Sequence, residues 1–184
     1  MALRDLLGPW TGVAYRHIPA GVSRSALDET YLGRSPGNRW NEAGTPTLCF
    51  ASDIAVVLAE YGRHIATEIP DGVPERLARS LWEVAIWLER TLDLRDPRTI
   101  DAMGSGPVED WILDVKSTQA TANYLRTQAG VQALIVPSVA FLDRPDTYNL
   151  IVYRDRIDPE VAFGQPKHVR DFVLDARGGS AQQD

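Results

Sequence analysis

The sequence contains a single cysteine, Cys49, among its 184 residues. One thiol cannot form an internal disulfide, and this scarcity is typical of proteins from a reducing cytoplasm. The chain also lacks any apolar run approaching the roughly 20 residues of a membrane-spanning helix. Its beginning, Met1 to Asp5, has an early acid and no apolar core of the kind found in signal peptides. We therefore expect a cytoplasmic protein that does not enter a membrane.

Lysine is also scarce, and the 25 acidic residues outnumber the 19 basic ones. The formal net charge is -6, the isoelectric point is about 5.1, and the lysines are Lys116 and Lys167 alone. A general nucleic-acid binder or a protein of anionic membrane surfaces would need a basic face, so both classes are excluded. A small anionic ligand stays compatible with these numbers, because a few arginines suffice to form a local pocket.

Several common motifs of chemistry are missing. The three histidines, His17, His64 and His168, lack the spacing of metal ligands, so no metal site is expected. The sequence has no phosphate-binding loop ending in Gly-Lys, no Gly-x-Gly-x-x-Gly and no Gly-x-Ser-x-Gly elbow. The short segment Gly104-Ser105-Gly106 is predicted to be a turn. Neither a nucleotide site of the first two kinds nor a serine hydrolase of the third kind is therefore expected.

The composition and the order of the predicted elements indicate one α+β domain. Hydrophobic residues make up 44% of the chain and charged residues 24%, which is typical of a globular protein. Strands and helices alternate irregularly rather than in strict βαβ order, and we find no second-domain boundary. We place the domain at residues 1–177 and a loose polar tail at 178–184.

Apolar periodicity places the individual elements. Alternation or short apolar runs predict strands at Gly12–His17, Thr47–Ala51, Leu81–Leu94 (as one strand or two), Gln132–Val139, Tyr148–Arg154 and Phe172–Leu174. Helical spacing and capping residues predict helices at Ile54–Ile65 after Ser52 or Asp53, Asp96–Met103, around Trp111–Ile112, and Thr118–Gln128 between Ser117 and Gly130. Turn residues predict irregular structure at Gly8–Trp10, Gly33–Gly37 and Pro70–Pro74.

The stretch from Asn38 to Ser52 and the helix after it carry the most chemistry. Arg39 stands at the beginning of this stretch, in a predicted turn. Glu60 is the single charge between Ile54 and Gly62, so its carboxylate is expected to be partly buried and to need partners. A guanidinium and a sequestered carboxylate together suit a site that holds an anionic ligand and stabilises a developing cation.

Each polar residue of interest has a structural explanation when it is taken alone. Arg39 could simply stack on the indole of Trp40, Arg16 could be a surface residue, and Glu60 could form a structural ion pair. Ser138 could end a strand, and Asn149 could be a turn residue. Cys49 lies in an apolar strand with no basic neighbour in sequence, and an apolar setting raises the pKa of a thiol. We therefore interpret Cys49 as a buried structural cysteine rather than a nucleophile.

The order of these residues along the chain carries more information than any one of them. The segments are Tyr15-Arg16, Asn38-Arg39-Trp40-Asn41, Gly44-Thr45-Pro46, Ala59-Glu60, Thr118-Gln119, Val136-Pro137-Ser138 and Asn149-Leu150. This order resembles the RES domain family, named for arginine, glutamate and serine. The resemblance covers roughly Tyr15 to Tyr153.

The resemblance implies a fold with mixed sheets and flanking helices like that of ADP-ribosyltransferases. It implies that NAD is the substrate and that the bond between nicotinamide and ribose is broken, with transfer of ADP-ribose to phosphate, water or a protein. Many family members are toxins of bacterial toxin–antitoxin pairs, usually neutralised by an Xre-type antitoxin, so such a partner is implied here. No metal is implied.

The same resemblance implies roles for the individual residues. Arg39, helped by Arg16, would hold the anionic pyrophosphate, and Glu60 would stabilise positive charge on the ribose. Ser138 and Asn149 would bond the polar edges of the ligand. Trp40 and Cys49 complete the implied nucleotide site.

Two positions depart from the family pattern. Asn38 replaces the usual glycine before the arginine, and Cys49 stands where the family has an active-site tyrosine. A cysteine supplies neither the ring nor the hydroxyl, so stacking on the ligand would be weaker. Two alternatives to the NAD-cleaving enzyme therefore stay open, a module that binds a nucleotide or a partner without catalysis and a cysteine-dependent enzyme. A symmetric dimer is the default expectation for the assembly.

Overall fold

The structure is a computed structural model, and the residues that it describes are 2–21, 25–28, 37–68 and 76–175. The loops predicted at residues 33–36 and Pro70–Pro74 and the tail predicted at 178–184 lie outside the described residues. The domain limits that depend on that tail stay a prediction.

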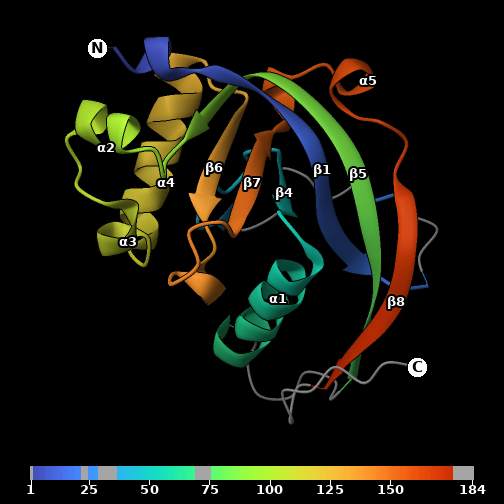
Figure 1. Cartoon of the computed structure of the whole chain (residues 1–184). Helices are drawn as coiled ribbons and strands as arrows, with labels where there is room; N and C mark the ends of the chain where they lie inside the picture. The colour runs from blue at the N-terminus through green and yellow to red at the C-terminus, as the bar shows by residue number, and fades with distance from the viewer. Residues whose placement is uncertain (1, 22–24, 29–36, 69–75, 176–184) are drawn as a thin grey trace.

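The main sheet closes on itself (Figure 1). Its strands are β1 (Gly8–Pro19), β4 (Thr47–Ala51), β5 (Arg76–Asp93), β6 (Ala133–Pro137), β7 (Tyr148–Tyr153) and β8 (Lys167–Asp175). They follow the order β1-β4-β7-β6-β5-β8, and an additional pairing joins β1 to β5. Because both ends of the run β1-β4-β7-β6-β5 then meet, these five strands form a ring with β8 attached to β5.

The long strand β5 makes this closure feasible. It pairs with β1 antiparallel from Arg79 to Thr91 on one edge. On the other edge it pairs with β8 over its first half and, in parallel, with β6 at Thr91–Asp93. One strand of 18 residues therefore spans two neighbours in succession.

Most helices cover the outside of the ring, whereas the last one, at Pro159–Ala162, contributes Ala162 to the core inside it. The helices are α1 (Ile54–Glu68), α2 (Pro97–Met103), α3 (Val108–Trp111), α4 (Val115–Tyr124) and α5 (Pro159–Ala162), with a π-helical turn at Leu125–Ala129 and 3₁₀ turns at Leu3–Leu6, Val139–Phe141 and Arg154–Arg156. In Figure 1, α2, α3 and α4 gather beside β6, and α1 lies apart from them near β4. Among the described residues, no helix has the length and apolar content that crossing a bilayer requires.

Strand alternation assigns side chains to the inside or the outside of the ring. On β4 and β7, Leu48, Phe50, Leu150 and Val152 belong to the core inside the ring. The residues between them face outward, because successive side chains of a strand point to opposite faces. Ile151 accordingly packs in the core under α4. This outward face of β4 and β7 is the surface on which the candidate site is built.

Most of the predicted elements are present. The strand at Thr47–Ala51 has the predicted limits, and the helix after it begins at Ile54 with Asp53 Oδ1 accepting from the Val56 N–H at 3.0 Å. The segment predicted as one strand or two is a single strand, β5. Gly130 ends the π-helical turn with φ of 70°, as its glycine identity predicts.

Three predictions about element limits were wrong. Gly8–Trp10 is the beginning of β1 rather than a turn, and a register shift between Gly8 and Trp10 accommodates Pro9, which cannot donate to a ladder. The cap of α4 is Asp114, whose carboxylate accepts from the N–H groups of Lys116 and Ser117, so the helix begins three residues earlier than Thr118. The last strand is β8, longer than the three residues predicted.

Acid should destabilise the fold through His17. Its ring packs against the ring of Tyr61 with 4.3 Å between the ring centroids. Burial, followed by the charges of Arg79 and Arg16, lowers the pKa of His17 to about 3. Between that value and the usual 6.5 of the unfolded chain, only the unfolded state binds the proton, so stability falls as the pH falls. The expected loss from this group is up to about 1.4 kcal/mol per pH unit.

Urea unfolding of the wild type and of His17→Gln at pH 6.5, 5.5 and 4.5 measures this contribution. The variant should lose stability less steeply with acid than the wild type does. Equal slopes for the wild type and His17→Gln would contradict the assignment.

Candidate active site

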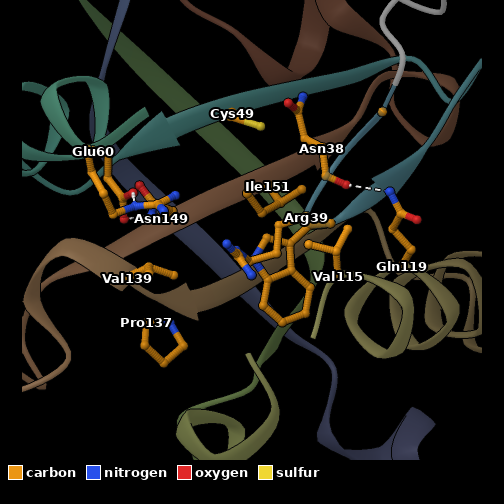
Figure 2. A pocket seen from close by; sticks show the side chains of 13 residues that line it. Asn38, Arg39, Cys49, Glu60, Val115, Gln119, Pro137, Val139, Asn149 and Ile151 are labelled. Atoms are coloured by element: carbon orange, nitrogen blue, oxygen red, sulfur yellow. Dashed lines mark hydrogen bonds and ion pairs between the residues drawn. The ribbon is translucent and has the colours of Figure 1, made fainter. Parts of the chain in front are cut away.

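A small hairpin presents Arg39–Trp40 to the outer face of the ring. Its strands are β2 (Gly37–Asn38) and β3 (Asn41–Glu42), so these two residues form the turn. Gln119 of α4 donates its side-chain N–H to the carbonyls of Asn38 at 2.9 Å and Asn41 at 3.2 Å. Helix α4 thereby holds both strands of the hairpin in place (Figure 2).

The two turn residues have different surroundings. The Arg39 guanidinium donates to the backbone carbonyl of Ile112 and is partly open to solvent. Trp40 is 5% exposed, lies edge-on to Trp111 with 5.9 Å between ring centroids, and accepts a hydrogen bond from the Tyr153 hydroxyl at its carbonyl. Trp40 therefore anchors the hairpin, while Arg39 lines the pocket.

The Glu60 carboxylate is held by three donors. Its Oε1 accepts from Ser138 Oγ at 2.7 Å, from Asn149 Nδ2 at 3.0 Å and from the Ala140 N–H at 3.4 Å. Its Oε2 lies 3.5 Å from Arg63 Nε, one turn along α1. The end of β6 and the beginning of β7 thus fix one carboxylate oxygen against the sheet.

Arg39 and Glu60 line the same pocket of about 450 Å³. Its walls come from the hairpin, β4, α1, α4, the end of β6 and β7, and they are partly apolar through Val115, Pro137 and Val139. Figure 2 shows the pocket with Glu60 and Asn149 at one end and Gln119 at the other. The structure therefore places the arginine and the glutamate at one pocket, as the sequence led us to expect for their positions; their roles stay a prediction.

A second pocket of about 340 Å³ adjoins the first where β1 and β4 separate. These two strands share one Cα pair, Tyr15 with Ala51, and then diverge. Arg16 and His17 line this second pocket. The residues that line both pockets are Asn38, Cys49, Glu60 and Asn149. The carboxylate of Glu60 therefore lies at the junction of the two pockets.

Arg16 lines the second pocket, and its side chain is largely surrounded by protein atoms. Its Nη1 donates to the carbonyl of Ala26 at 2.7 Å. Burial lowers the pKa of Arg16, while Cys49 and Asp28 act in the opposite direction. A guanidinium stays protonated throughout the physiological range, so this pocket carries a positive charge. Arg16 and Arg39 line adjoining pockets rather than one.

The interpretation of Cys49 as a buried structural cysteine was wrong. Its side chain is exposed at the floor of both pockets, because Leu48 and Phe50 take the inward positions on β4 and Cys49 points outward. Protein atoms still surround it on its other sides. This burial raises the pKa of the Cys49 thiol, and the nearby Arg16 lowers it in part. A protonated thiol is a weak nucleophile.

Ser138 lies behind Glu60 rather than at the ligand side. It is 0% exposed and is absent from the residues that line the two pockets. Its hydroxyl is directed at Glu60 Oε1. A direct bond from Ser138 to a ligand does not fit this position, because the carboxylate stands between them. Asn149 does line the pocket and also donates to Glu60.

Sequence reasoning missed two residues of the site. Gln119 was matched to a motif without a role, and its contact with the hairpin joins residues about 80 positions apart, which no local pattern reveals. Arg63 was not considered, although residues three apart on a helix are neighbours and Glu60 had already been singled out. Among the described residues, no group of three His, Cys, Asp or Glu side chains is arranged to hold a metal ion.

Comparison with protein-family models identifies the family of this chain. A family model described as "RES domain" matches residues 14–175, which is most of the chain. The chain belongs to the RES domain family. The match extends the resemblance expected for Tyr15 to Tyr153 through β8.

A solved structure gives the same fold. A chain of the M. tuberculosis MbcT–MbcA toxin–antitoxin complex superimposes with a TM-score of 0.65 at 23% sequence identity, covering 92% of this RES domain protein and 87% of that chain. At this identity the likeness concerns the fold, and it confirms the predicted single α+β domain with a sheet and flanking helices. No curated protein matches the sequence significantly.

The hairpin should depend on glycine at position 37. Gly37 has φ of 100°, and a Cβ there would lie 2.9 Å from the Asn41 carbonyl oxygen and 3.3 Å from Gln119 Nε2. Gly37→Ala would add this contact to the backbone strain of a positive φ. We expect a loss of about 2–3 kcal/mol in the free energy of unfolding.

Gly44→Ala is the matched control for that experiment. Gly44 has φ of 84°, and a Cβ added there would meet nothing within 4 Å, so its replacement adds the strain without the contact. We expect Gly44→Ala to lose about 1–2 kcal/mol in the free energy of unfolding. Urea unfolding measures this quantity for both variants. Equal losses for the two variants would show that the close packing at Gly37 is unimportant.

Proposed function

We propose that this RES domain protein cleaves NAD between nicotinamide and ribose and transfers ADP-ribose to phosphate, water or a protein side chain. The observation that supports this most is the Glu60 carboxylate, fixed by Ser138 and Asn149 in the pocket that Arg39 also lines. A carboxylate held at one place and an arginine at the same hollow are the two groups that this chemistry needs.

The reaction builds positive charge on the ribose. The electron pair of the bond between the ribose carbon and the nicotinamide nitrogen leaves with nicotinamide and neutralises its ring. The ribose carbon becomes cationic until an acceptor oxygen bonds to it, and with water as the acceptor a proton is released. A carboxylate placed near that carbon stabilises the cation, as in glycoside cleavage.

Glu60 is suited to this role by the way its two oxygens differ. Oε1 is occupied by three donors from the protein, so the carboxylate cannot turn freely. Oε2 has the Arg63 contact and is the oxygen left to approach a ribose in the pocket. Ser138 then acts as a positioning residue, because it holds Glu60 without reaching the substrate.

The arginines would hold the pyrophosphate of NAD. Guanidinium groups bind phosphate oxygens in a bidentate manner, and Arg39 lines the larger pocket. Arg16 supplies positive charge from the adjoining pocket. Trp40, Val115 and Val139 give the larger pocket an apolar wall that excludes water from part of the ligand.

We further propose that the protein is the toxin of a cytoplasmic toxin–antitoxin pair. Membership of the RES family and the similar fold of a chain from the MbcT–MbcA toxin–antitoxin complex support this. The partner would be an antitoxin protein, of the Xre type if the usual family pairing applies. Growth arrest on expression, relieved by the product of a neighbouring gene, is the observation that this proposal requires.

The enzymatic proposal is tested by incubating purified protein with NAD, with and without phosphate, and measuring free nicotinamide by chromatography. Glu60→Gln keeps the shape of the side chain and removes its charge, so nicotinamide release should fall by about 10²–10³. Arg39→Ala should mainly raise the KM for NAD, because it removes a ligand contact made before the reaction.

Two exposed positions provide matched controls. Glu89→Gln on β5 removes a carboxylate outside both pockets, and Arg98→Ala on α2 removes an exposed guanidinium. Both should keep wild-type activity. Folded Glu60→Gln and Arg39→Ala proteins that release nicotinamide at the wild-type rate would exclude this site.

A second candidate function is binding of a nucleotide without turnover. The observation that favours it is Cys49, which leaves the floor of both pockets without the aromatic ring that the family places there. Under this hypothesis the wild type binds NAD without releasing nicotinamide, and Cys49→Tyr restores release. Release by the wild type at a rate that Cys49→Tyr does not raise would exclude it.

A further inference from the structure

Arg63 is the second arginine of the larger pocket. It follows Glu60 by three residues on α1, and its Nε lies 3.5 Å from Glu60 Oε2. Arg63 also lines the pocket, as Arg39 of the hairpin does. The pocket therefore has two guanidinium groups on separate elements and one carboxylate beside the second of them.

The contact between Arg63 and Glu60 is loose. Its length exceeds the 2.7–2.9 Å that is typical of a charge-assisted hydrogen bond, whereas Ser138 approaches the other oxygen to 2.7 Å. The side chains of Arg63 and Glu60 are 29% and 22% exposed, so solvent reaches the pair. Pairs at this spacing on a partly exposed helix face contribute little to stability. Loss of this one contact with Glu60 therefore costs little free energy.

The same contact opposes the proposed chemistry while it lasts. A positive charge beside Oε2 offsets the negative charge that would stabilise a cationic ribose. Arg63 would relieve this if an anionic ligand drew its guanidinium away from Glu60. An entering anion of two linked phosphoryl groups offers one group to Arg39 and the other to Arg63.

We propose that Arg63 is a ligand-binding residue that exchanges Glu60 for the diphosphate of the substrate. Binding of a nucleoside diphosphate then does two things at once. It places the ligand between Arg39 and Arg63, and it frees Glu60 Oε2 to face the ribose. This inference rests on the proposed function, because it assigns the diphosphate of that substrate to a second arginine.

The test compares Arg63→Gln with the wild type in two measurements. Calorimetric titration with ADP-ribose should show about 10- to 100-fold weaker binding by Arg63→Gln, since hydrogen bonds to charged groups contribute affinity of this size. Kinetics with NAD should show a raised KM and a kcat within about threefold of the wild type, because the contact is already made in the bound state.

Arg63→Lys and Arg98→Gln complete the design. Arg63→Lys keeps the charge without the planar fork and should bind ADP-ribose with an affinity between those of the wild type and Arg63→Gln. Arg98→Gln changes the net charge equally at an exposed site on α2 and should bind as the wild type does. Unfolding curves for all variants report whether each is folded.

The outcomes separate the two proposals. A wild type that binds ADP-ribose while Arg63→Gln binds it equally well overturns the role of Arg63 and leaves the proposed function standing. A raised kcat in Arg63→Gln with unchanged binding would mean that Arg63 stays on Glu60 in the complex, which also overturns the inference. A wild type that binds neither NAD nor ADP-ribose overturns both.

Discussion

The hydrogen bonds from Ser138 and Asn149 to one oxygen of Glu60 are the interaction on which the site depends. They join α1 to the end of β6 and the beginning of β7, residues 78 and 89 positions away in the chain. A partly buried carboxylate is costly unless donors compensate for its lost hydration. Here the donors come from the strands that also form the pocket floor. The same hydrogen bonds therefore compensate for the lost hydration of Glu60 and orient its carboxylate toward the pocket.

The closed sheet supplies the rigid frame for that arrangement. Because β4 and β7 turn Leu48, Phe50, Leu150 and Val152 into the ring, the positions between them face the pocket. Helix α4 holds the hairpin of Arg39 through Gln119, and α1 carries Glu60 and Arg63. Arg39 thus stands on a different element from Glu60 and Arg63, and this separation leaves room for a ligand between Arg39 and Glu60.

Local patterns in the sequence predicted much of this. The strand at Thr47–Ala51, the helix after Asp53 and the partial burial of Glu60 follow from periodicity, capping and an isolated charge. The motif order indicated the family, which the family model confirms. Long-range features could not be found in this way, because no local pattern encodes the closure of β1 on β5 or the contact of Gln119 with the hairpin.

The outward direction of Cys49 could have been predicted from the sequence, since alternation on β4 places its side chain on the opposite face from Leu48 and Phe50. The apolar neighbours of Cys49 on the strand favoured a buried position instead.

A crystal structure of the protein with ADP-ribose tests the central claim most directly. The account predicts the diphosphate at the guanidinium of Arg39 and the ribose that carried nicotinamide within contact of Glu60 Oε2, at the junction of the two pockets near Cys49. Ligand density at another surface, or a ribose directed away from Glu60, would contradict it.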